Sequence, residues 1–320
     1  MNSIFPTRYS TLEPIDLARF VERTWDIGAN VRCTFFHKGE NDNYRIESEQ
    51  GKFCLRVYRA RHSNPRKVEP ELTLLNELAE EGLPVSHPRH TRQQSLSVNV
   101  TAPEGVRTLV LFSWAPGAML KRDAPTSWDI FGRELARLHH ASAETSKLHH
   151  YDKESLLTRP AARWSRRMQA IGLNPLEVQK LAEILDERMD PLWDRLPSSL
   201  VHGDAAGGNS HVDESGNLTW FDFLWKGYGP SVWDLATFRR GAGQVQPNWD
   251  LALEGYQSVR PLSVAEQEAI PHLAAIRCIF VTDLIIDECD IDLHAEATPS
   301  WFDSRVRELR RLVDGSHWVQ

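Results

Sequence analysis

The sequence of 320 residues has little cysteine and no closely spaced cysteine pair. Its four cysteines, Cys33, Cys54, Cys278 and Cys289, are scattered along the chain, and no C-x-x-C motif occurs among them. Structural zinc sites and disulfide frameworks both need cysteines at defined short spacings. We therefore expect reduced thiols in the core and no structural zinc.

The sequence also lacks an excess of positive charge and a long apolar run. Its formal net charge is -7, whereas a protein that binds nucleic acid needs a basic surface to neutralise phosphates. No apolar run approaches the roughly 20 residues that span a bilayer. The opening MNSIFPTRYS has neither the basic start nor the apolar stretch of a secretory signal. These absences predict a cytoplasmic protein with no nucleic acid partner and no membrane contact.

What the chain does have is the ordinary composition of a globular protein. Hydrophobic residues make up 41% and charged residues 25%, which suffices to bury a full core in one large or two modest domains. Between residues 31 and 113 the apolar pattern is strand-like, in VRCTFFH, NYRIES, FCLRVYR and TLVLFSW, with turns at KGEND and EQGK. This pattern predicts a small sheet.

One helix interrupts the predicted sheet, and the rest of the chain is mainly helical. Residues 65–81 place Leu72, Leu75 and Leu78 at helical spacing, and this pattern stops at Gly82. After the APG tripeptide the pattern becomes largely helical. The predicted organisation is a sheet domain, a short connector and a helical domain, over residues 1–113, 114–118 and 119–320.

The stretch HGDAAGGN, at residues 202–209, concentrates polar side chains in one short loop. It holds Asp204 and Asn209, and a second acid, Asp222, ends the predicted strand LTWFDF. Phosphoryl transfer needs one carboxylate to accept the proton of the acceptor hydroxyl, and an amide with a second carboxylate to hold Mg²⁺. The spacing therefore predicts Asp204 as the catalytic base and Asn209 and Asp222 as the Mg²⁺ ligands.

These residues resemble the aminoglycoside phosphotransferase and choline kinase family, distant relatives of the protein kinases. The motif is His202-Gly203-Asp204 with Asn209, then Phe221-Asp222-Phe223 and Asp234-Leu235-Ala236. The resemblance implies an α+β, protein-kinase-like fold of two lobes: a small antiparallel-sheet lobe with one inserted helix and a larger, mainly helical lobe. It also implies that His202 and Asp234 hold the loop in shape, and that ATP is the phosphoryl donor, with GTP left open.

The same resemblance suggests nucleotide contacts in the N-terminal lobe. FFHKGENDNYRI resembles the family's phosphate-covering hairpin, which makes Gly39 and Asn41 candidate nucleotide-binding residues. Arg56 in FCLRVYR occupies the place where a kinase has the lysine that binds the nucleotide phosphates. Arginine keeps the positive charge and adds a bidentate fork, although the two cations are not interchangeable. Glu71, on the inward stripe of the predicted helix, is its expected partner, and Glu69 is the alternative.

Candidate acceptor-binding residues lie in two places. FVTDLIIDECDIDLHAEA puts Asp283, Asp287 and Asp290 on one helix face, where a cationic substrate would relieve their mutual repulsion; a solvated face is the alternative. Trp225, three residues after Asp222, is expected either to line an acceptor pocket or to pack in the core. Its neighbour Lys226 adds a positive charge suited to a transferring phosphate or an anionic substrate group.

Three functions compete for this set of residues. The first is an ATP- and Mg²⁺-dependent kinase that phosphorylates a hydroxyl of a small molecule, such as an aminoglycoside-like antibiotic, an amino alcohol, a sugar or homoserine; a protein acceptor is a further alternative. The second is a metal-dependent hydrolase built on the HGD and HVD pairs, which leaves Asn209 and Asp222 without a role. The third is a catalytically silent nucleotide-binding regulatory protein, to which Arg56 gives some support.

Overall fold

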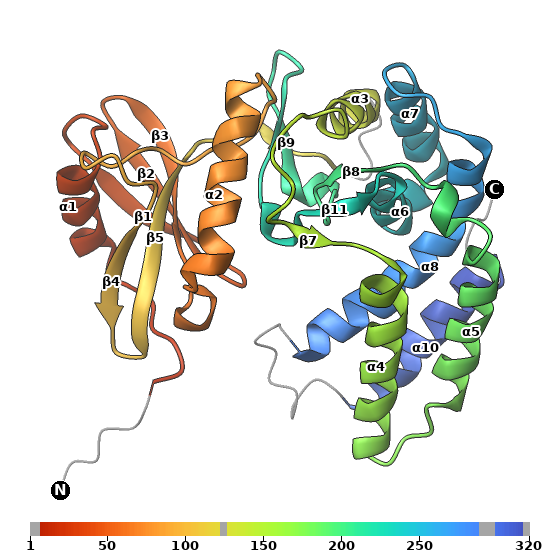
Figure 1. The fold of residues 1–320 in the computed structure, drawn as a ribbon. Helices are drawn as coiled ribbons and strands as arrows, with labels where there is room; N and C mark the ends of the chain where they lie inside the picture. The colour runs from red at the N-terminus through yellow and green to blue at the C-terminus, as the bar shows by residue number, and fades with distance from the viewer. Residues whose placement is uncertain (1–6, 122–126, 288–297, 316–320) are drawn as a thin grey trace, which may run out of the picture. The chain divides into compact units, whose positions relative to one another are not determined.

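The computed structural model describes residues 7–121, 127–287 and 298–315, in which the chain divides into the units Met1–Pro116 and Gly117–Gln320 (Figure 1). The first unit contains an antiparallel sheet of five strands in the order β1-β2-β3-β5-β4. Its elements are α1 (Pro14–Thr24), β1 (Arg32–Lys38), β2 (Asp42–Ser48), β3 (Gly51–Val57), α2 (Pro65–Glu80), β4 (Val98–Ala102) and β5 (Gly105–Ser113). The predicted small sheet with one inserted helix is confirmed.

The strand pattern of β3 explains how this sheet uses its two faces. Phe53, Leu55 and Val57 are buried in one hydrophobic core together with side chains of α1, a helix that the sequence analysis did not predict. Successive side chains of a strand point to opposite faces, so Arg56 lies on the face turned away from that core. Figure 1 shows α1 and α2 on opposite sides of the sheet.

Helix α2 begins and ends at residues that the sequence marks. The Asn64 side chain accepts a hydrogen bond from the Arg66 N–H at 3.0 Å, which caps the helix, and Pro65 follows it. The helix ends before Gly82, whose φ of 82° is the left-handed conformation that glycine adopts without penalty. The leucines of the predicted stripe are buried, which fixes the face that α2 presents to the sheet.

The second unit is mainly helical and carries two small sheets. Its helices are α3 (Trp128–Leu138), α4 (Arg159–Ala170), α5 (Leu176–Met189), α6 (Val232–Arg240), α7 (Gln246–Gln257), α8 (Val264–Asp287) and α10 (Pro299–Val313). Its strands are β6 (Ala118–Met119), β7 (His149–His150), β8 (Ser198–Val201), β9 (Ser210–Val212), β10 (Leu218–Trp220) and β11 (Gly227–Pro230). They pair in the orders β10-β9-β6 and β7-β11-β8, so the HGDAAGGN loop passes from one small sheet to the other.

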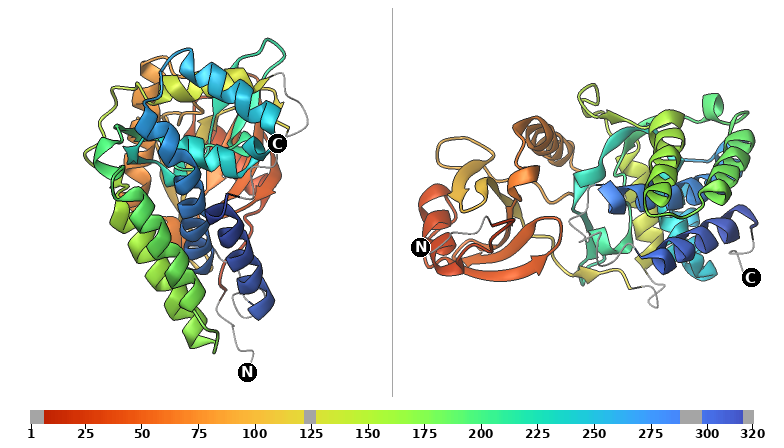
Figure 2. Two further views of the ribbon diagram at one scale, coloured as in Figure 1. Left: turned by 90° about the vertical axis from the view of Figure 1, so that its right-hand side faces the viewer. Right: turned by 90° about the horizontal axis from the view of Figure 1, so that it is seen from below.

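Helix α8 forms the centre of this unit. It packs against α4, α6 and α10, which lie around it in the two views of Figure 2. Its segment Val264–Ile286 is long and apolar enough to cross a membrane by composition, with a mean hydropathy of 1.8. The expectation that no stretch reaches that length is therefore wrong. Since 78% of the apolar window is buried by other parts of the chain, a core helix accounts for its composition.

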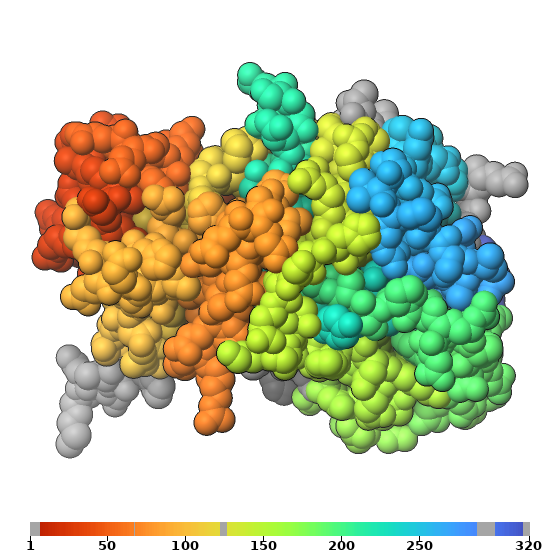
Figure 3. All heavy atoms as spheres, turned by 45° about the horizontal axis from the view of Figure 1, so that its top comes forward, coloured from red at the N-terminus to blue at the C-terminus, as the bar shows by residue number. Residues whose placement is uncertain are grey.

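Two glycines allow α3 and α7 to pack closely, and both helices reach the surface seen in Figure 3. A Cβ atom added to Gly132 of α3 would overlap the backbone carbonyl of Ala252, and one added to Gly255 of α7 would overlap that of Asp129. Backbone carbonyls cannot move aside as a flexible side chain would. The spacing of these two helices therefore depends on the absence of both side chains.

We predict that Gly132→Ala destabilises the protein. Alanine favours a helix over glycine by up to about 1 kcal/mol, but forcing the helices apart should cost more and lower the free energy of unfolding by about 1–3 kcal/mol. Denaturant unfolding measures the change. The matched control is Glu254→Ala, an exposed position of α7, with an expected change within about 0.5 kcal/mol. A Gly132→Ala protein as stable as the wild type would contradict this account of the packing.

Candidate active site

Arg56 and Glu71 form a buried ion pair in the first unit. Arg56 lies on β3, and its Nη1 is 3.3 Å from Oε1 of Glu71 on α2. The two side chains are 11% and 2% exposed, so little solvent weakens their attraction. The pairing predicted from helical spacing is confirmed, and the alternative partner, Glu69, is exposed.

Aromatic side chains complete the surroundings of this pair. The Tyr58 hydroxyl donates to Glu71 Oε2 at 3.2 Å, so both carboxylate oxygens have a partner. Burial and the Glu71 charge raise the pKa of Tyr58 well above its usual range, which keeps the hydroxyl protonated as a donor. The Arg56 guanidinium lies 5.3 Å from the ring centre of Phe112. A buried charge pair needs such supplementary contacts to offset its desolvation.

The turn between β1 and β2 contains Gly39 and Asn41, the other predicted nucleotide-binding residues. The Gly39 N–H donates to the Asn41 carbonyl at 3.1 Å, and the Gly39 carbonyl accepts from the Arg59 guanidinium at 2.6 Å. The Asn41 side chain is buried, and its Oδ1 accepts from the Arg59 N–H at 3.3 Å. Asn41 therefore stabilises the hairpin internally, a role that the sequence did not indicate.

In the second unit the carboxylate of Asp234 fixes the start of the HGDAAGGN loop. Asp234 stands in the first turn of α6 and is fully buried. It accepts the backbone N–H groups of His202 at 2.7 Å and Gly203 at 2.9 Å, and Nε2 of His139 lies 3.2 Å from it. The loop leaves β8 at this point, so the Asp234 side chain holds the backbone of its first two residues.

The ring of His202 connects this loop to the strand that precedes Asp222. Its Nε2 donates to the Phe221 carbonyl at 3.1 Å, and its Nδ1 accepts the Asp204 N–H at 3.3 Å. A carbonyl only accepts and an amide N–H only donates, so these two partners define one neutral tautomer. The ring also packs on Phe223, with 4.3 Å between ring centres. His202 and Asp234 thus shape the loop through hydrogen bonds and packing.

Asn209 faces the carboxylate of Asp204 across the loop. Its Nδ2 donates to the Asp204 backbone carbonyl at 2.9 Å and to Asp204 Oδ2 at 2.8 Å. With the amide nitrogen committed to Asp204, the amide oxygen is the atom of Asn209 that a cation would meet. The Asn209 carbonyl in turn accepts the Phe221 N–H at 3.0 Å, so the residue before Asp222 is hydrogen-bonded to the same loop.

Asp222 has an uncommon backbone conformation. Its φ of 65° and ψ of 60° are left-handed, a region in which aspartate is one of the few tolerated side chains. Such conformations persist where the surroundings over-determine them, often at functional sites. Gly203 has a φ of 79°, and a Cβ there would overlap the Trp225 carbonyl. The glycine of HGD is therefore required by the close approach of the segment that follows Asp222.

The sequence did not indicate Arg277, a basic residue that contacts Asp204. Arg277 of α8 donates through Nη2 to Asp204 Oδ1 at 2.7 Å and through Nη1 to the Gly203 carbonyl at 2.7 Å. Its only signal in the sequence is a lone arginine in the apolar run AAIRCIF. The role of His139 was also missed: this buried histidine joins Asp234 to Tyr256, whose hydroxyl oxygen is 2.7 Å from Nδ1.

The residues predicted to contact an acceptor have different surroundings from those expected. Asp283 is 1% exposed and accepts from the Arg163 guanidinium of α4, with Nε 2.9 Å from Oδ1. This corrects the expected open acidic face, because a cation of the chain itself already offsets that charge. The side chain of Asp287 and the whole of Asp290 lie outside the described residues.

Trp225 and Lys226 are both partly exposed. The Trp225 ring lies 6.5 Å from that of Phe280, edge to face, and its backbone carbonyl accepts from the Tyr151 hydroxyl at 2.7 Å. The Trp225 ring is therefore partly buried against Phe280 and partly exposed.

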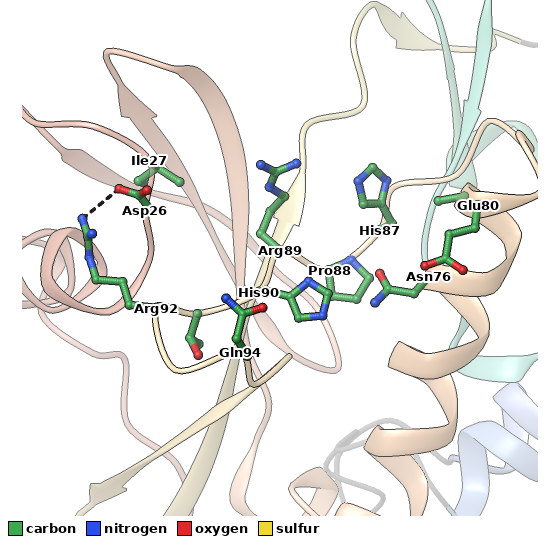
Figure 4. Close-up of a pocket in the computed structure, with 12 residues that line it drawn as sticks. Asp26, Ile27, Asn76, Glu80, His87, Pro88, Arg89, His90, Arg92 and Gln94 are labelled. Carbon is green, nitrogen blue, oxygen red and sulfur yellow. Dashed lines mark ion pairs between the residues drawn. The ribbon is translucent and has the colours of Figure 1, made fainter.

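A separate hollow of about 720 Å³ lies within the first unit (Figure 4). Asn76 and Glu80 of α2 and the side chain of Arg89 line it, and Arg92 pairs there with Asp26 at 3.1 Å. Figure 4 shows Asn76 and Glu80 on α2, Arg89 and Arg92 on the segment that follows it, and Asp26 on the segment that follows α1. None of the residues predicted for phosphoryl transfer lines this hollow.

The fold and the site together define a protein-kinase-like phosphotransferase. One unit supplies an antiparallel sheet with a buried cation–carboxylate pair, and the other supplies an aspartate, an asparagine and a second aspartate on hydrogen-bonded segments. The model of the phosphotransferase enzyme family matches residues 33–266, and the chain belongs to this family. The class of protein to which the chain belongs is that of the small-molecule kinases.

Relatives with similar sequences cover most of the chain. An uncharacterized protein of Deinococcus radiodurans is 30% identical over 290 residues, which are 88% of this chain and 84% of that protein. A homoserine kinase of Paramagnetospirillum magneticum is 28% identical over 273 residues, which are 78% of this chain and 79% of that enzyme.

Solved structures share the fold at lower sequence identity. Amicoumacin kinase hAmiN, in complex with AMP-PNP, Ca²⁺ and Ami, has a TM-score of 0.73 at 17% identity, with 97% of this chain and 95% of that chain covered. A microcompartment-associated aminopropanol kinase has a TM-score of 0.71 at 20% identity, with 96% and 99% covered. The protein-kinase-like α+β fold expected from the sequence is confirmed.

We predict that His139 makes stability depend on pH. Burial lowers its pKa below the usual 6.5, so the unfolded chain takes up a proton near that pH and the folded chain does not. Stability from this residue is present above about pH 6.5 and is lost below it, by up to about 1.4 kcal/mol per pH unit. His139→Gln keeps a donor and an acceptor but does not titrate, so its unfolding free energy should fall less steeply on acidification.

Denaturant unfolding of both proteins between pH 7.5 and 5.5 measures this difference. Burial also lowers the pKa of His272, which contributes equally to the two proteins and cancels in the comparison. Parallel pH dependences would show that His139 does not carry the effect.

Proposed function

We propose that this protein transfers the γ-phosphoryl group of ATP to a hydroxyl of a small molecule that carries an amino group, in the cytoplasm. The observation that carries the proposal is the arrangement of Asp204 and Asn209. Asp204 presents a carboxylate with an exposure of 37%, held by the Asn209 amide nitrogen at 2.8 Å, so the amide oxygen is the atom of Asn209 that is left to bind a cation.

Asp204 is the proposed catalytic base. An acceptor hydroxyl loses its proton as its oxygen attacks the γ-phosphorus, and a carboxylate within hydrogen-bonding reach both orients the hydroxyl and accepts the proton. The Asp204 N–H donates to Nδ1 of His202 at 3.3 Å, which fixes the backbone that carries the carboxylate.

Asn209 and Asp222 would hold the metal ion. Their side chains offer an amide oxygen and a carboxylate, and Mg²⁺ prefers such hard oxygen donors. The Phe221 N–H donates to the Asn209 carbonyl at 3.0 Å, which ties the residue before Asp222 to Asn209, and the His202 ring donates to the Phe221 carbonyl at 3.1 Å. When bound, Mg²⁺ would neutralise charge on the phosphate oxygens. These residues fit the ion by donor type and by their common support.

Arg56 is the proposed contact to the nucleotide phosphates. Glu71 and Tyr58 fix the position of its guanidinium, and a fixed cation stabilises phosphate charge without reorganising. An arginine here favours bidentate contact over the single-point contact of a lysine. ATP is the proposed donor, and AMP-PNP in the related amicoumacin kinase supports an adenine nucleotide.

The names of similar proteins support an amino alcohol as the acceptor. Homoserine kinases and an aminopropanol kinase are among them, and both named acceptors carry a hydroxyl and an amine. Asp283 is not assigned to recognise that amine, because Arg163 already pairs with it. Trp225 and Lys226, partly exposed and close to Asp222 in sequence, are the proposed acceptor contacts.

The hydrolase alternative finds less support in the surroundings of its second pair. His211 packs edge to face on Phe221, with 4.8 Å between ring centres. Asp213 caps the turn after β9, accepting the N–H groups of Ser215 at 2.9 Å and Asn217 at 2.8 Å. Both side chains thus have structural roles in the hairpin.

We predict that Asp204→Asn lowers kcat by about 10²- to 10⁴-fold, because the amide cannot accept the hydroxyl proton. ADP release measured in Mg²⁺ with homoserine, aminopropanol and aminoglycosides as acceptors reports the rate. Asp213→Asn is the matched control, and its rate should stay within about twofold of the wild type because it lies outside the proposed site. An Asp204→Asn protein with the wild-type rate would remove Asp204 as the catalytic base, and an inactive Asp213→Asn protein would favour the hydrolase alternative, which needs the HVD pair.

We also predict that Asp222→Asn raises the Mg²⁺ concentration needed for half-maximal activity by about tenfold or more, since the metal loses a charged ligand. The titration of initial rate against Mg²⁺ at saturating ATP gives this value. Lys226→Met serves as the comparison, because it changes a neighbouring side chain that offers the metal no oxygen. Equal Mg²⁺ dependence in the wild type and in Asp222→Asn would remove Asp222 from the metal site.

A further inference from the structure

Arg277 is a buried cation in the middle of the apolar helix α8. Its side chain is 4% exposed, and its neighbours in sequence, Ile276 and Cys278, are fully buried. A guanidinium in such surroundings is costly unless it is paired and hydrogen-bonded. Burial lowers the pKa of Arg277, and the nearby Asp204 charge opposes that shift. The hydrogen-bond partners of the guanidinium must therefore offset the cost of burying its charge.

Both hydrogen-bond partners of the guanidinium belong to the HGDAAGGN loop. Nη1 donates to the Gly203 carbonyl and Nη2 to Asp204 Oδ1, each at 2.7 Å. Because the guanidinium is planar and its nitrogens are rigidly joined, the two bonds fix the Asp204 carboxylate relative to its own backbone. The guanidinium is itself held between aromatic contacts, with Cζ 5.4 Å from the ring centres of Trp233 and of Phe280.

The Asp204 carboxylate is therefore held through both of its oxygens. Oδ1 accepts from Arg277, and Oδ2 accepts from Asn209 at 2.8 Å. Each carboxylate oxygen has two lone pairs, so one site on each remains after these bonds. Rotation of the side chain would break a bond on either side. The orientation of the remaining lone pairs is thus set by two residues that lie 73 and 5 positions away in sequence.

We propose that Arg277 is a positioning residue for phosphoryl transfer, which holds Asp204 in the orientation that meets the acceptor hydroxyl. The proposal rests on the function proposed above. In that reaction the acceptor O–H bond breaks and its proton passes to Asp204, the oxygen bonds to the γ-phosphorus, and ADP leaves with the electron pair of the broken P–O bond. Arg277 neither gives nor takes a proton, and it acts on the reaction only through Asp204.

The first measurement compares Arg277→Met and Arg277→Lys with the wild type. A misplaced base should lower kcat by about 10- to 100-fold in Arg277→Met, while KM for ATP and for the acceptor changes by less than about threefold. Lysine keeps the charge but cannot reach both partners with a rigid fork, so its kcat should lie between the two. Arg240→Met, which removes a partly buried ion pair with Glu308, is the matched control and should retain the wild-type kcat.

A double-mutant cycle separates this role from a merely structural one. Wild type, Arg277→Met, Asp204→Asn and the double variant are compared in kcat and in thermal unfolding. If Arg277 acts through Asp204, its replacement should have almost no effect on kcat once Asp204 is Asn. The double variant should also unfold at a higher temperature than Asp204→Asn, in which the buried guanidinium has lost its carboxylate partner.

An unchanged kcat in Arg277→Met, equal losses of kcat in both backgrounds, or additive changes in unfolding temperature would overturn the positioning role. A wild type that phosphorylates none of the acceptors would overturn the proposed function itself. The wild-type rate therefore tells the two failures apart.

Discussion

The hydrogen bonds to the buried carboxylate of Asp234 are the interactions on which the HGDAAGGN loop of the second unit depends. The carboxylate accepts hydrogen bonds from two consecutive backbone N–H groups and lies beside the ring of His139. One side chain therefore satisfies the backbone donors at the place where β8 ends and the loop begins. Buried backbone donors without partners would be costly, and here no strand continues to supply them. The positions of the proposed site residues in this unit, from Asp204 to Asp222, depend on the place at which Asp234 fixes the start of the loop.

Two buried arginines of the protein pair with carboxylates in ways that serve different ends. Arg56 is held by Glu71 and Tyr58, so the carboxylate positions the cation. Arg277 is held by α8 and its aromatic neighbours, so the cation positions the carboxylate of Asp204. A buried ion pair seldom adds much net stability. In the proposed function, the gain in both cases is a charged group that is fixed before substrate arrives, as electrostatic catalysis requires.

The parts of the fold and site that the sequence predicted are those with short-range signals. Alternation in β3, the glycine that ends α2, the spacing of Glu71 and the HGDAAGGN loop all act over a few residues. The missed contacts join distant segments, such as His139 to Asp234 over 95 positions and Arg277 to Asp204 over 73. Periodicity cannot specify such pairs. The surroundings of Asp283 were misjudged for the same reason, because no pattern near it in the sequence indicates its pairing with Arg163 of α4.

The presence of arginine at position 56 has a consequence for chemical labelling. A nucleotide analogue that carries a reactive acyl group would form an amide with the primary amine of a lysine at this position. A guanidinium stays protonated under all ordinary conditions and offers no nucleophilic nitrogen. With Arg56 on β3 and Glu71 beside it, such a reagent would meet no reactive amine at this position.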